Sequence, residues 1–325
     1  MGNRLLDVID LKTYFITPRS VVKAVDGVSF HVDENETLGI VGESGCGKTV
    51  TSLSILRLLP RPAGTIVGGK IMFEGLDIVK MTEKQLQRIR GGKISMILQD
   101  PMASLNPVFN IGNQIGEAIT THTKITGKNL VLRVIDILQR VKIPSPEARI
   151  RDFPHQMSGG MKQRVVGAIS ISCHPRLLIA DEPTTSLDVT IQAQYLQLLK
   201  DLQAEFGMSL IFITHDFGIV ASMCDRVAVM YAGKVVETAP VRDIFFRPAH
   251  PYTVALLKAV PKLETETDRL ISIKGQPPRL DNLPEGCSFS PRCFQCGDGC
   301  LRAEPTLVQV GLDHYARCWQ LQGKP

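Results

Sequence analysis

The chain has 325 residues, a length that predicts about two domains. Hydrophobic residues make up 44% and charged residues 21%, which excludes intrinsic disorder, collagen and coiled-coil rods as descriptions of the whole chain. The net charge of +5 is spread without long runs and is too small to indicate nucleic-acid binding by itself.

The first hundred residues have the pattern of strands followed by a helix. Residues 28–32 alternate between apolar and polar, as in a half-buried strand. Residues 37–41 form a nearly continuous apolar run, which is typical of a strand buried on both faces of a parallel sheet. After a glycine-rich turn, apolar residues over 53–59 predict a helix that ends near Pro60, and residues 94–98 predict a further strand.

Helical and strand patterns alternate in the middle of the chain. Apolar residues from 130 to 141 recur with spacings of three and four, which indicates one face of a helix. Residues 177–180 and 210–213 predict short buried strands, and a helical stripe over 191–206 separates them. Strand, helix and strand at this spacing predict a parallel βαβ unit, and residues 227–231 predict a late strand.

The composition changes after residue 240. Prolines become frequent there, and five of the eight cysteines fall between residues 287 and 318. We therefore predict a main domain of residues 1–240 and a small, loop-rich appendage of residues 241–325.

Neither a membrane span nor a signal peptide is evident. No apolar stretch approaches the ~20 residues that cross a bilayer. The first residues, Met1 to Asp7, lack the apolar core of a signal peptide. We expect a cytosolic chain whose association with a membrane runs through a partner.

The segment from Gly42 to Thr49 reads GESGCGKT and fits the phosphate-binding pattern G-x-x-x-x-G-K-[ST]. Its glycines allow backbone N–H groups to turn inward around phosphate oxygens, because side chains would block the approach. The helix that follows adds the positive end of its dipole. Lys48 can reach the β- and γ-phosphates, and the Thr49 hydroxyl can bind Mg²⁺. Cys46, inside the loop, is best explained as a small, unreactive filler.

Polar residues follow three of the predicted strands. Asp181 is placed to hold Mg²⁺ through water, and Glu182 can polarise a water that attacks the γ-phosphate. His215 follows the strand over 210–213, where its imidazole could contact the γ-phosphate or that water. Gln99 follows the strand over 94–98, and its amide oxygen could join the Mg²⁺ ligands.

Residues 157–164, MSGGMKQR, resemble the signature sequence of ATP-binding-cassette (ABC) ATPases. Met157 and Met161 depart from the commonest form of that signature, whereas Ser158, Gly159 and Gly160 are intact. A serine and two glycines at a helix start make a second anion cradle. One chain with two cradles makes sense if two cassettes enclose ATP head to tail, each offering its phosphate loop to one nucleotide and its signature to the other.

The other ABC motifs are present in order over about residues 1–240. In this resemblance Gln99 matches the Q-loop, Asp181 and Glu182 the Walker B pair, Ser186-Leu187-Asp188 the D-loop and His215 the switch histidine. The family also stacks adenine on an aromatic residue near the N-terminus, for which we favour Phe15 over Tyr14. The resemblance assigns catalysis to Lys48, Glu182 and His215, Mg²⁺ binding to Thr49, Gln99 and Asp181, and ATP binding to Phe15, Gly42, Ser44, Gly45, Cys46, Gly47, Lys48, Thr49, Val50, Gln99, Ser158, Gly159 and Gly160.

The same resemblance implies the fold class. It is α/β, with a RecA-like core of parallel strands, an antiparallel β lobe and a helical lobe over about residues 100–165. The loop-rich, metal-binding appendage completes the chain.

The appendage narrows the resemblance. His250-Pro251-Tyr252-Thr253, Gly275-Gln276-Pro277-Pro278 and residues 286–293, GCSFSPRC, are similar to the C-terminal extension of dipeptide and oligopeptide importer ATPases, an extension that nickel importers share. The resemblance implies ATP-driven closing and opening of a dimer. Its partners would be two transmembrane permease subunits and a sister ATPase or a second copy, with a solute-binding protein outside the cell acting indirectly. The chain would lie peripherally on the cytoplasmic face of the membrane, and no nucleic-acid partner is expected.

In a reducing compartment, clustered cysteines bind a metal more often than they form disulfides. The cluster therefore predicts a metal site. Their spacing, C-x5-C-x2-C-x3-C-x17-C, has only one C-x2-C pair, whereas zinc sites usually show two. A 4Fe–4S cluster, zinc, and disulfides or free thiols all remain open on spacing alone. The resemblance implies a 4Fe–4S cluster on Cys287, Cys293, Cys300 and Cys318, with Cys296 as an alternative ligand.

Two further hypotheses come from other classes. A soluble ABC ATPase acting on DNA or ribosomes would carry two cassettes or a long coiled-coil insertion, and this chain has one cassette and no heptad run. A binding-only subunit that has lost hydrolysis is disfavoured by Glu182 and His215, because degenerate cassettes tend to lose such residues.

Overall fold

The computed structural model of the chain describes residues 3–100, 102–185, 187–260 and 272–322. It divides into two compact units, and each is described by itself. Unit 1 comprises residues 1–3, 33–36 and 80–212, and unit 2 comprises residues 4–32, 37–79 and 213–325. The predicted boundary between a main domain and an appendage near residue 240 divides the chain in another way, and it stays a prediction.

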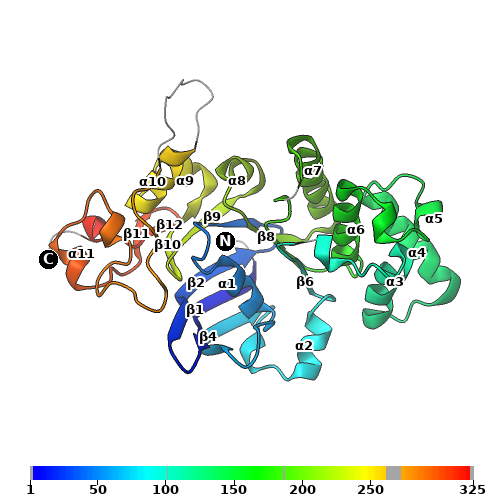
Figure 1. The fold of residues 1–325 in the computed structure, drawn as a ribbon, viewed down its shortest axis with the longest axis horizontal. Helices are drawn as coiled ribbons and strands as arrows, with labels where there is room; N and C mark the ends of the chain where they lie inside the picture. The colour runs from blue at the N-terminus through cyan, green and yellow to red at the C-terminus, as the bar shows by residue number, and fades with distance from the viewer. Residues whose placement is uncertain (1–2, 101, 186, 261–271, 323–325) are drawn as a thin grey trace. The chain divides into compact units, whose positions relative to one another are not determined.

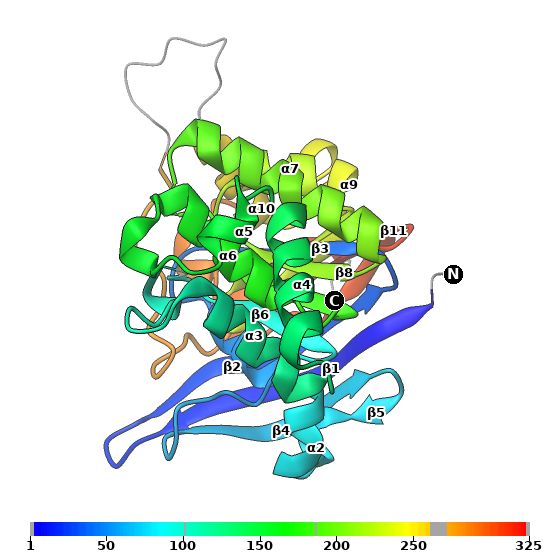
Figure 2. The same ribbon diagram turned by 90° about the vertical axis from the view of Figure 1, so that its right-hand side faces the viewer.

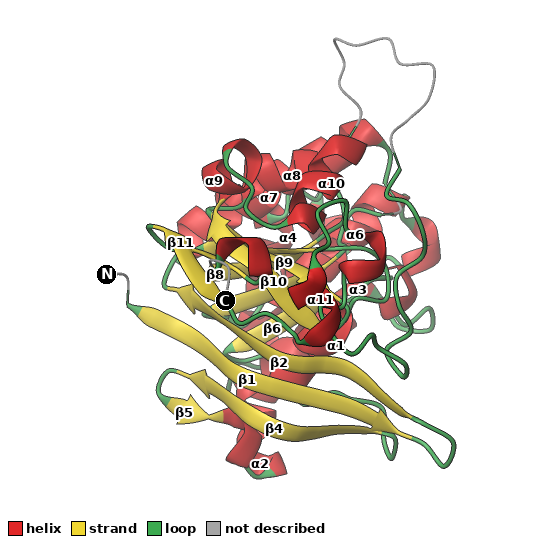
Figure 3. Cartoon of the chain, turned by 90° about the vertical axis from the view of Figure 1, so that its left-hand side faces the viewer, coloured by secondary structure: helices red, strands yellow, loops and turns green. Residues whose placement is uncertain are grey.

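Unit 2 contains an antiparallel four-stranded sheet in the order β2-β1-β4-β5 (Figure 3). β1 and β4 pair along most of their length, with an irregular register between Ile9 and Thr13. Buried and exposed side chains alternate along much of β1 and β2, as expected for strands with one face in a core. The predicted strand over 28–32 lies within β2. The bounds are β1 Arg4–Ile16, β2 Val21–Asp33, β4 Gly64–Phe73 and β5 Leu76–Asp77.

A second set of strands in unit 2 follows the order β11-β12-β10-β9-β3. All five residues of β3 are buried, and β3 runs parallel to β9, as its apolar sequence predicts. β12 pairs antiparallel with β10, so the C-terminal region adds strands to this sheet, which the sequence did not indicate. The bounds are β3 Thr37–Val41, β9 Arg226–Tyr231, β10 Lys234–Pro240, β11 Val308–Gly311 and β12 His314–Ala316.

The first helix of unit 2, α1 (Lys48–Ile55), is shorter than predicted. It stops five residues before Pro60 because Arg57 adopts a left-handed conformation with φ 51°. The Arg57 N–H donates to Ser54 O at 3.0 Å, and the Leu58 N–H donates to Leu53 O at 2.8 Å. This is the Schellman pattern, in which two backbone bonds close the end of a helix.

The C-terminal region of unit 2 is more regular than the predicted loop-rich appendage. Helices α9 and α10 follow β10, and a short helix lies among the clustered cysteines. The helices of this unit after α1 are α8 Phe217–Met223, α9 Val241–Phe246, α10 Pro251–Ala259 and α11 Asp298–Arg302, with 3₁₀ turns η1 Ile78–Lys80, η4 Ser290–Arg292 and η5 Trp319–Leu321.

Unit 1 contains the neighbouring strands β8, β7 and β6 in that order. β6 and β7 are parallel, and α7 connects β7 to β8 along the chain. The three strands and the helix between β7 and β8 confirm the predicted elements. The bounds are β6 Ile94–Ile97, β7 Leu177–Asp181 and β8 Ser209–Ile213.

Helices make up most of the rest of unit 1. α3, α4 and α6 pack on one another (Figures 1 and 2), and the predicted apolar stripe over 130–141 places Val134, Ile137 and Leu138 in their shared core. Asn110 caps the start of α3 through a 2.8 Å bond from the Asn113 N–H. The bounds are α2 Glu83–Ile89, α3 Ile111–His122, α4 Gly127–Arg140, α5 Pro146–Arg149, α6 Gly159–Ile171 and α7 Val189–Phe206, with 3₁₀ turns η2 Met102–Ser104 and η3 Pro154–Gln156. Across the described parts of both units, the helices are too short or too polar to span a bilayer.

Candidate nucleotide-binding site

The phosphate loop lies in unit 2 between the end of β3 and the start of α1. Two of its glycines are required by close backbone neighbours. A Cβ on Gly42 would lie 2.2 Å from Met230 O, and a Cβ on Gly47 would lie 2.3 Å from Ala24 O. Both also have positive φ, which favours glycine. A Cβ on Gly45 would meet nothing within 4 Å, so this turn of the loop faces open space in which a phosphate can be accommodated.

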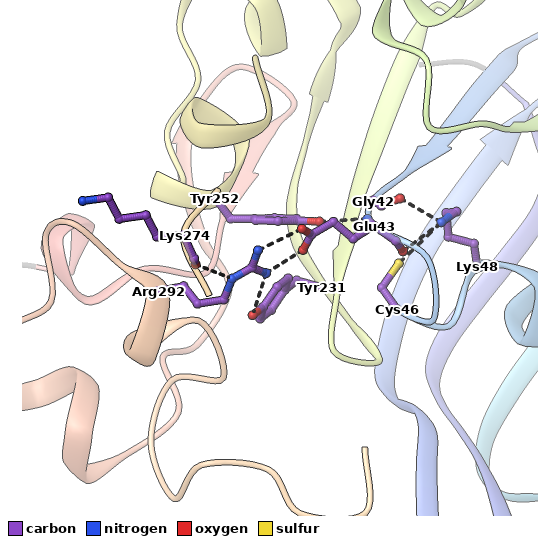
Figure 4. Close-up of polar contacts among 8 residues, drawn as sticks. All are labelled: Gly42, Glu43, Cys46, Lys48, Tyr231, Tyr252, Lys274 and Arg292. Carbon is purple, nitrogen blue, oxygen red and sulfur yellow. Dashed lines mark hydrogen bonds and ion pairs between the residues drawn. The ribbon is translucent and has the colours of Figure 1, made fainter. Parts of the chain in front are cut away.

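Lys48 is only 6% exposed. Its Nζ donates to Gly42 O at 2.8 Å and to Glu43 O at 3.0 Å (Figure 4). These bonds hold the ammonium group against the loop, where a phosphate oxygen would meet it. Thr49 and Val50 follow in the first turn of α1 and are partly buried, whereas Ser44 is exposed.

Cys46 is a buried part of the loop, with 4% of its surface exposed. Burial raises the pKa of its thiol, which disfavours the reactive thiolate. Its carbonyl oxygen accepts a 2.9 Å bond from the Gly233 N–H in the β9–β10 turn. These contacts agree with the interpretation of Cys46 as filler.

The two candidate adenine-stacking residues, Tyr14 and Phe15, are consecutive residues of β1. The Tyr14 hydroxyl donates to Asp26 Oδ1 at 2.7 Å, and burial followed by this bond raises the pKa of Tyr14 to about 12. Phe15 has no polar group to satisfy, and its ring lies against Gly64, where a Cβ would be 3.2 Å from Phe15 Cε1. The absence of a side chain on Gly64 therefore lets the Phe15 ring lie close to this strand.

His215, the expected switch histidine, is exposed just after β8. The next residue, Asp216, caps α8 by accepting from the Gly218 N–H at 2.7 Å and the Ile219 N–H at 3.3 Å. The cap fixes where the chain turns after β8, and His215 is therefore presented at that turn.

The acidic pair lies in unit 1 at the carboxyl end of β7. Asp181 is the last residue of the strand and is 1% exposed. Glu182 is half-buried and has a positive φ of 47°, an uncommon conformation for a residue with a side chain. Its Oε2 accepts a 3.1 Å bond from the Thr185 hydroxyl. This bond orients the carboxylate that the sequence assigns to water activation.

Gln99 is exposed two residues after the end of β6. Ile97 of β6 is in register with Ala180 of β7, and the two strands are parallel. The structure therefore brings Gln99 and the acidic pair to the same edge of unit 1, as the strand pattern predicts.

The signature residues begin α6, also in unit 1. The Ser158 side chain caps the helix by accepting from the Met161 N–H at 3.4 Å. Ser158 and Gly159 are exposed, and a Cβ on Gly160 would lie 2.9 Å from Ile191 Cγ2 of α7. Met157, which departs from the usual signature, is 6% exposed and fills an apolar position.

The D-loop leads from the acidic pair into α7. Ser186, its first predicted residue, lies outside the described residues. Asp188 caps α7 by accepting from the Ile191 N–H at 3.0 Å.

The clustered cysteines lie in unit 2, and all eight cysteines of the chain are free. Burial and then neighbouring charges, those of Cys300 and Cys293 among them, raise the pKa of Cys287 to about 12. Burial, with Cys300 among the further causes, also raises the pKa of Cys293 and Cys318. Within the described ranges, however, no three His, Cys, Asp or Glu side chains are grouped so that they could hold a metal ion. The predicted metal-binding character of the appendage is therefore not observed.

Sequence reasoning missed three residues at the phosphate loop: Glu43, Tyr252 and Arg292. The last two belong to motifs of the C-terminal resemblance, but nothing in their local sequence indicates a contact with the loop. They are separated from Glu43 by 209 and 249 residues.

A buried strand, a glycine loop and a buried lysine in unit 2, with an acidic strand end and a Ser-Gly-Gly helix start in unit 1, define a nucleotide-hydrolysing protein of the ATP-binding-cassette class. Solved structures agree on the fold. A dimeric cassette bound to ADP and phosphate superposes with a TM-score of 0.65 at 22% identity, covering 73% of this chain and 99% of that one. The cbiO1 protein of Clostridium perfringens gives a TM-score of 0.65 at 26% identity, covering 76% and 92%.

Family models and curated relatives identify the chain further. Residues 25–185 match the ABC transporter family, and residues 236–300 match the C-terminal region of oligopeptide/dipeptide transporters. The chain is 50% identical to the oligopeptide transport ATP-binding protein OppD of Bacillus subtilis over 98% of this chain and 89% of that protein. It is 47% identical to the dipeptide transport ATP-binding protein DppD of the same species, over 97% and 94%. The chain belongs to the ABC transporter family, whose ATP-binding proteins hydrolyse ATP to drive transport.

Proposed function

We propose that the chain is the ATP-hydrolysing subunit of an importer for dipeptides or oligopeptides. The observation that carries this proposal is the continuous match of cassette and C-terminal region: both family models fit in order, and relatives named for peptide transport align over nearly the whole chain. The complete set of ATPase motifs separates this function from that of a binding-only subunit.

The phosphate loop and α1 are proposed to bind the triphosphate of ATP. Lys48 and the loop N–H groups neutralise and orient its oxygens, and Phe15 stacks on the adenine. Glu182 accepts the proton of the attacking water, and His215 contacts the γ-phosphate or that water. The signature residues Ser158, Gly159 and Gly160 complete the site of a second cassette, because an exposed helix start is available to a nucleotide held elsewhere.

The donor set suits a magnesium ion. A hydroxyl on Thr49, an amide oxygen on Gln99 and the buried carboxylate of Asp181 are hard oxygen ligands of the kind Mg²⁺ takes. When bound, the ion neutralises the charge that develops on the phosphates.

The partners follow from this role. We propose two transmembrane permease subunits, a sister ATPase or a second copy of this chain, and a solute-binding protein that acts indirectly. The chain would lie peripherally at the cytoplasmic face of the membrane, held there by the permeases.

The 4Fe–4S cluster on Cys287, Cys293, Cys300 and Cys318 stays a prediction, as does zinc. The side chains as placed do not fit either group, because the described residues present no set of three metal ligands, and no step of the mechanism runs through a cluster. Iron and zinc analysis of the purified chain, together with its visible absorbance, tests the two metals.

Uptake by cells tests the proposed function. Deletion of the gene should abolish uptake of radiolabelled dialanine and trialanine and leave uptake of free alanine unchanged. The wild-type gene should restore it, and the Glu182→Gln gene should not. Unchanged peptide uptake together with lost nickel uptake would contradict the peptide assignment, and absence of phosphate release by the assembled wild-type complex would contradict the ATPase role.

A further inference from the structure

Glu43, the second residue of the phosphate loop, is held by the C-terminal part of the chain on one side and by Lys48 on the other (Figure 4). Its carboxylate and its backbone N–H both have partners beyond residue 250. Its carbonyl oxygen accepts from Lys48, which is expected to bind phosphate. The position of Glu43 and the position of the Lys48 ammonium are therefore coupled.

Arg292 makes the principal contact. Its Nη1 donates to Glu43 Oε2 at 2.6 Å and its Nη2 to Glu43 Oε1 at 2.9 Å, so the guanidinium and the carboxylate form a two-bond fork. The Arg292 side chain is only 3% exposed and that of Glu43 26%. Nη1 also donates to the Tyr231 hydroxyl at 3.3 Å, and the guanidinium carbon lies 5.8 Å from the centre of the Tyr231 ring. A pair this sheltered keeps one geometry better than an exposed pair.

Three separate C-terminal segments converge on this point. Tyr252, from HPYT, accepts the Glu43 N–H at 2.9 Å through its hydroxyl oxygen. The segment before GQPP seats Arg292, because the Lys274 carbonyl accepts from Arg292 Nε at 3.0 Å. Arg292 itself comes from SPRC. Tyr252 and Arg292 thus both contact Glu43 of the phosphate loop, and Lys274 holds Arg292 in place.

The residues that make these contacts are supported by a buried, closely packed cluster of aromatic rings. The rings of Tyr231, Tyr252 and Phe289 are at most 1% exposed, and their centroids are 4.6 to 5.3 Å apart. The start of α10 is anchored to β10, because the fully buried Glu237 carboxylate accepts from the His250 N–H at 2.8 Å. The extension can therefore transmit a displacement to Glu43 instead of absorbing it.

The charge of Glu43 gives the contact a second consequence. A carboxylate in a loop that binds a triphosphate repels the ligand unless a cation neutralises it. Arg292 supplies that positive charge and holds the carboxylate on the side away from Lys48 (Figure 4).

We propose that the C-terminal extension sets the affinity of the phosphate loop for ATP, with Arg292 and Tyr252 as positioning residues that act through Glu43. This inference rests on the proposed binding of ATP by the phosphate loop. Any change in the shape of the extension would then alter the affinity of the loop for nucleotide.

The test compares two arginine–carboxylate pairs of the extension in the full-length chain. Arg292→Met removes the fork on Glu43. Arg279→Met removes the fork on Asp281, which has similar bond lengths of 3.0 and 2.8 Å but an arginine 82% exposed. With Mg²⁺ and a ribose-labelled fluorescent ATP as probe, Arg292→Met should raise the dissociation constant roughly 5- to 20-fold. Arg279→Met should change it less than about twofold.

A kinetic readout separates positioning from simple stabilisation. In Arg292→Met, the KM for ATP should rise while kcat at saturating ATP changes less than about threefold. A merely structural tie would lower the melting temperature and the active fraction, leaving KM unchanged. If Arg292→Met does not fold, Arg292→Lys is judged by the same criteria, because lysine keeps the charge but loses the fork.

A double variant tests the route through Glu43. Glu43→Gln removes the repelling charge, so Arg292→Met/Glu43→Gln should bind ATP no more weakly than Arg292→Met alone. Wild-type affinity and KM in folded Arg292→Met, an equal loss in Arg279→Met, or weaker ATP binding by the double variant than by Arg292→Met would each overturn the inference. A wild-type chain that fails to bind ATP would instead contradict the ATPase assignment.

Discussion

Two glycine-bearing helix starts, the phosphate loop over residues 42–49 and the signature over residues 158–160, differ in how firmly the chain holds them. The phosphate loop is largely buried at Cys46 and Lys48, and it is bonded to the β9–β10 turn and the C-terminal extension. In the signature, Ser158 and Gly159 are exposed, and the Ser158 side chain caps the start of α6.

The difference indicates different tasks. A loop held by many bonds is preorganised, so binding ATP costs little further ordering. An exposed helix start with free approach suits a nucleotide that is already held by another cassette.

Glu182→Gln should remove hydrolysis and leave both the phosphate loop and the signature intact. The amide keeps the shape of the carboxylate but cannot accept the proton of water, so we expect turnover to fall by about 10²–10⁴ with nucleotide binding retained. Phosphate release and ATP binding by the assembled complex measure the two effects. The exposed Glu147→Gln on α5 is the matched control, and wild-type turnover in Glu182→Gln would remove this residue from the mechanism.

Lys48→Ala should weaken phosphate binding by the loop over residues 42–49. Loss of a charge-assisted bond to phosphate should weaken ATP binding by roughly 10- to 150-fold. Titration with fluorescent ATP measures it, and Lys128→Ala, an exposed lysine on α4, serves as control. Equal affinity in Lys48→Ala and Lys128→Ala would contradict the proposed phosphate contact.

Ser158→Ala should affect the signature at the start of α6 and leave the phosphate loop unchanged. It removes the α6 cap, at a cost of about 1 kcal/mol in unfolding free energy, and also the hydroxyl offered to the second nucleotide. Asn110→Ala removes the corresponding cap of α3 and should cost a similar amount. Only Ser158→Ala should lower turnover of the assembled complex, by roughly 2- to 10-fold. A matching loss of turnover in Asn110→Ala would attribute the effect to stability.

Low pH should destabilise the buried region around His250 that supports the phosphate loop. Burial lowers the pKa of His250 from its ordinary value of 6.5 to about 4, and the nearby Glu237 only partly opposes this. The unfolded chain therefore binds the proton more readily, so stability is complete above about pH 6.5 and falls as the pH drops toward 4, by at most about 1.4 kcal/mol per pH unit. Melting temperatures from pH 7.5 to 4.5 measure the slope. His250→Asn should flatten it and the exposed His155→Asn should not; equal slopes in all three proteins would contradict the assignment.

Local patterns in the sequence were sufficient for many elements. β3, β7 and β8 follow from short apolar runs, and α4 and α7 from helical stripes, because burial of one face or of a whole strand leaves a periodic trace. The end of α1 left no such trace. Its left-handed residue is Arg57 instead of the usual glycine, so the helix was predicted to continue.

The candidate site divides in the same way. The residues proposed to bind phosphate form continuous motifs, which the sequence alone reveals. The fork between Glu43 and Arg292 joins residues 249 positions apart, and neither has a spacing that indicates the other. Likewise, the cysteine spacing predicts a metal site, yet spacing carries no information on whether the thiols converge.

Lys48 of one cassette and Ser158 of another are proposed to enclose a single triphosphate. A cryo-EM structure of the assembled Glu182→Gln transporter with ATP and Mg²⁺ tests this arrangement. We expect density for ATP at the phosphate loop, with the signature serine of the opposing cassette against its γ-phosphate. Nucleotide bound with the two signature regions facing away from both phosphate loops would contradict it.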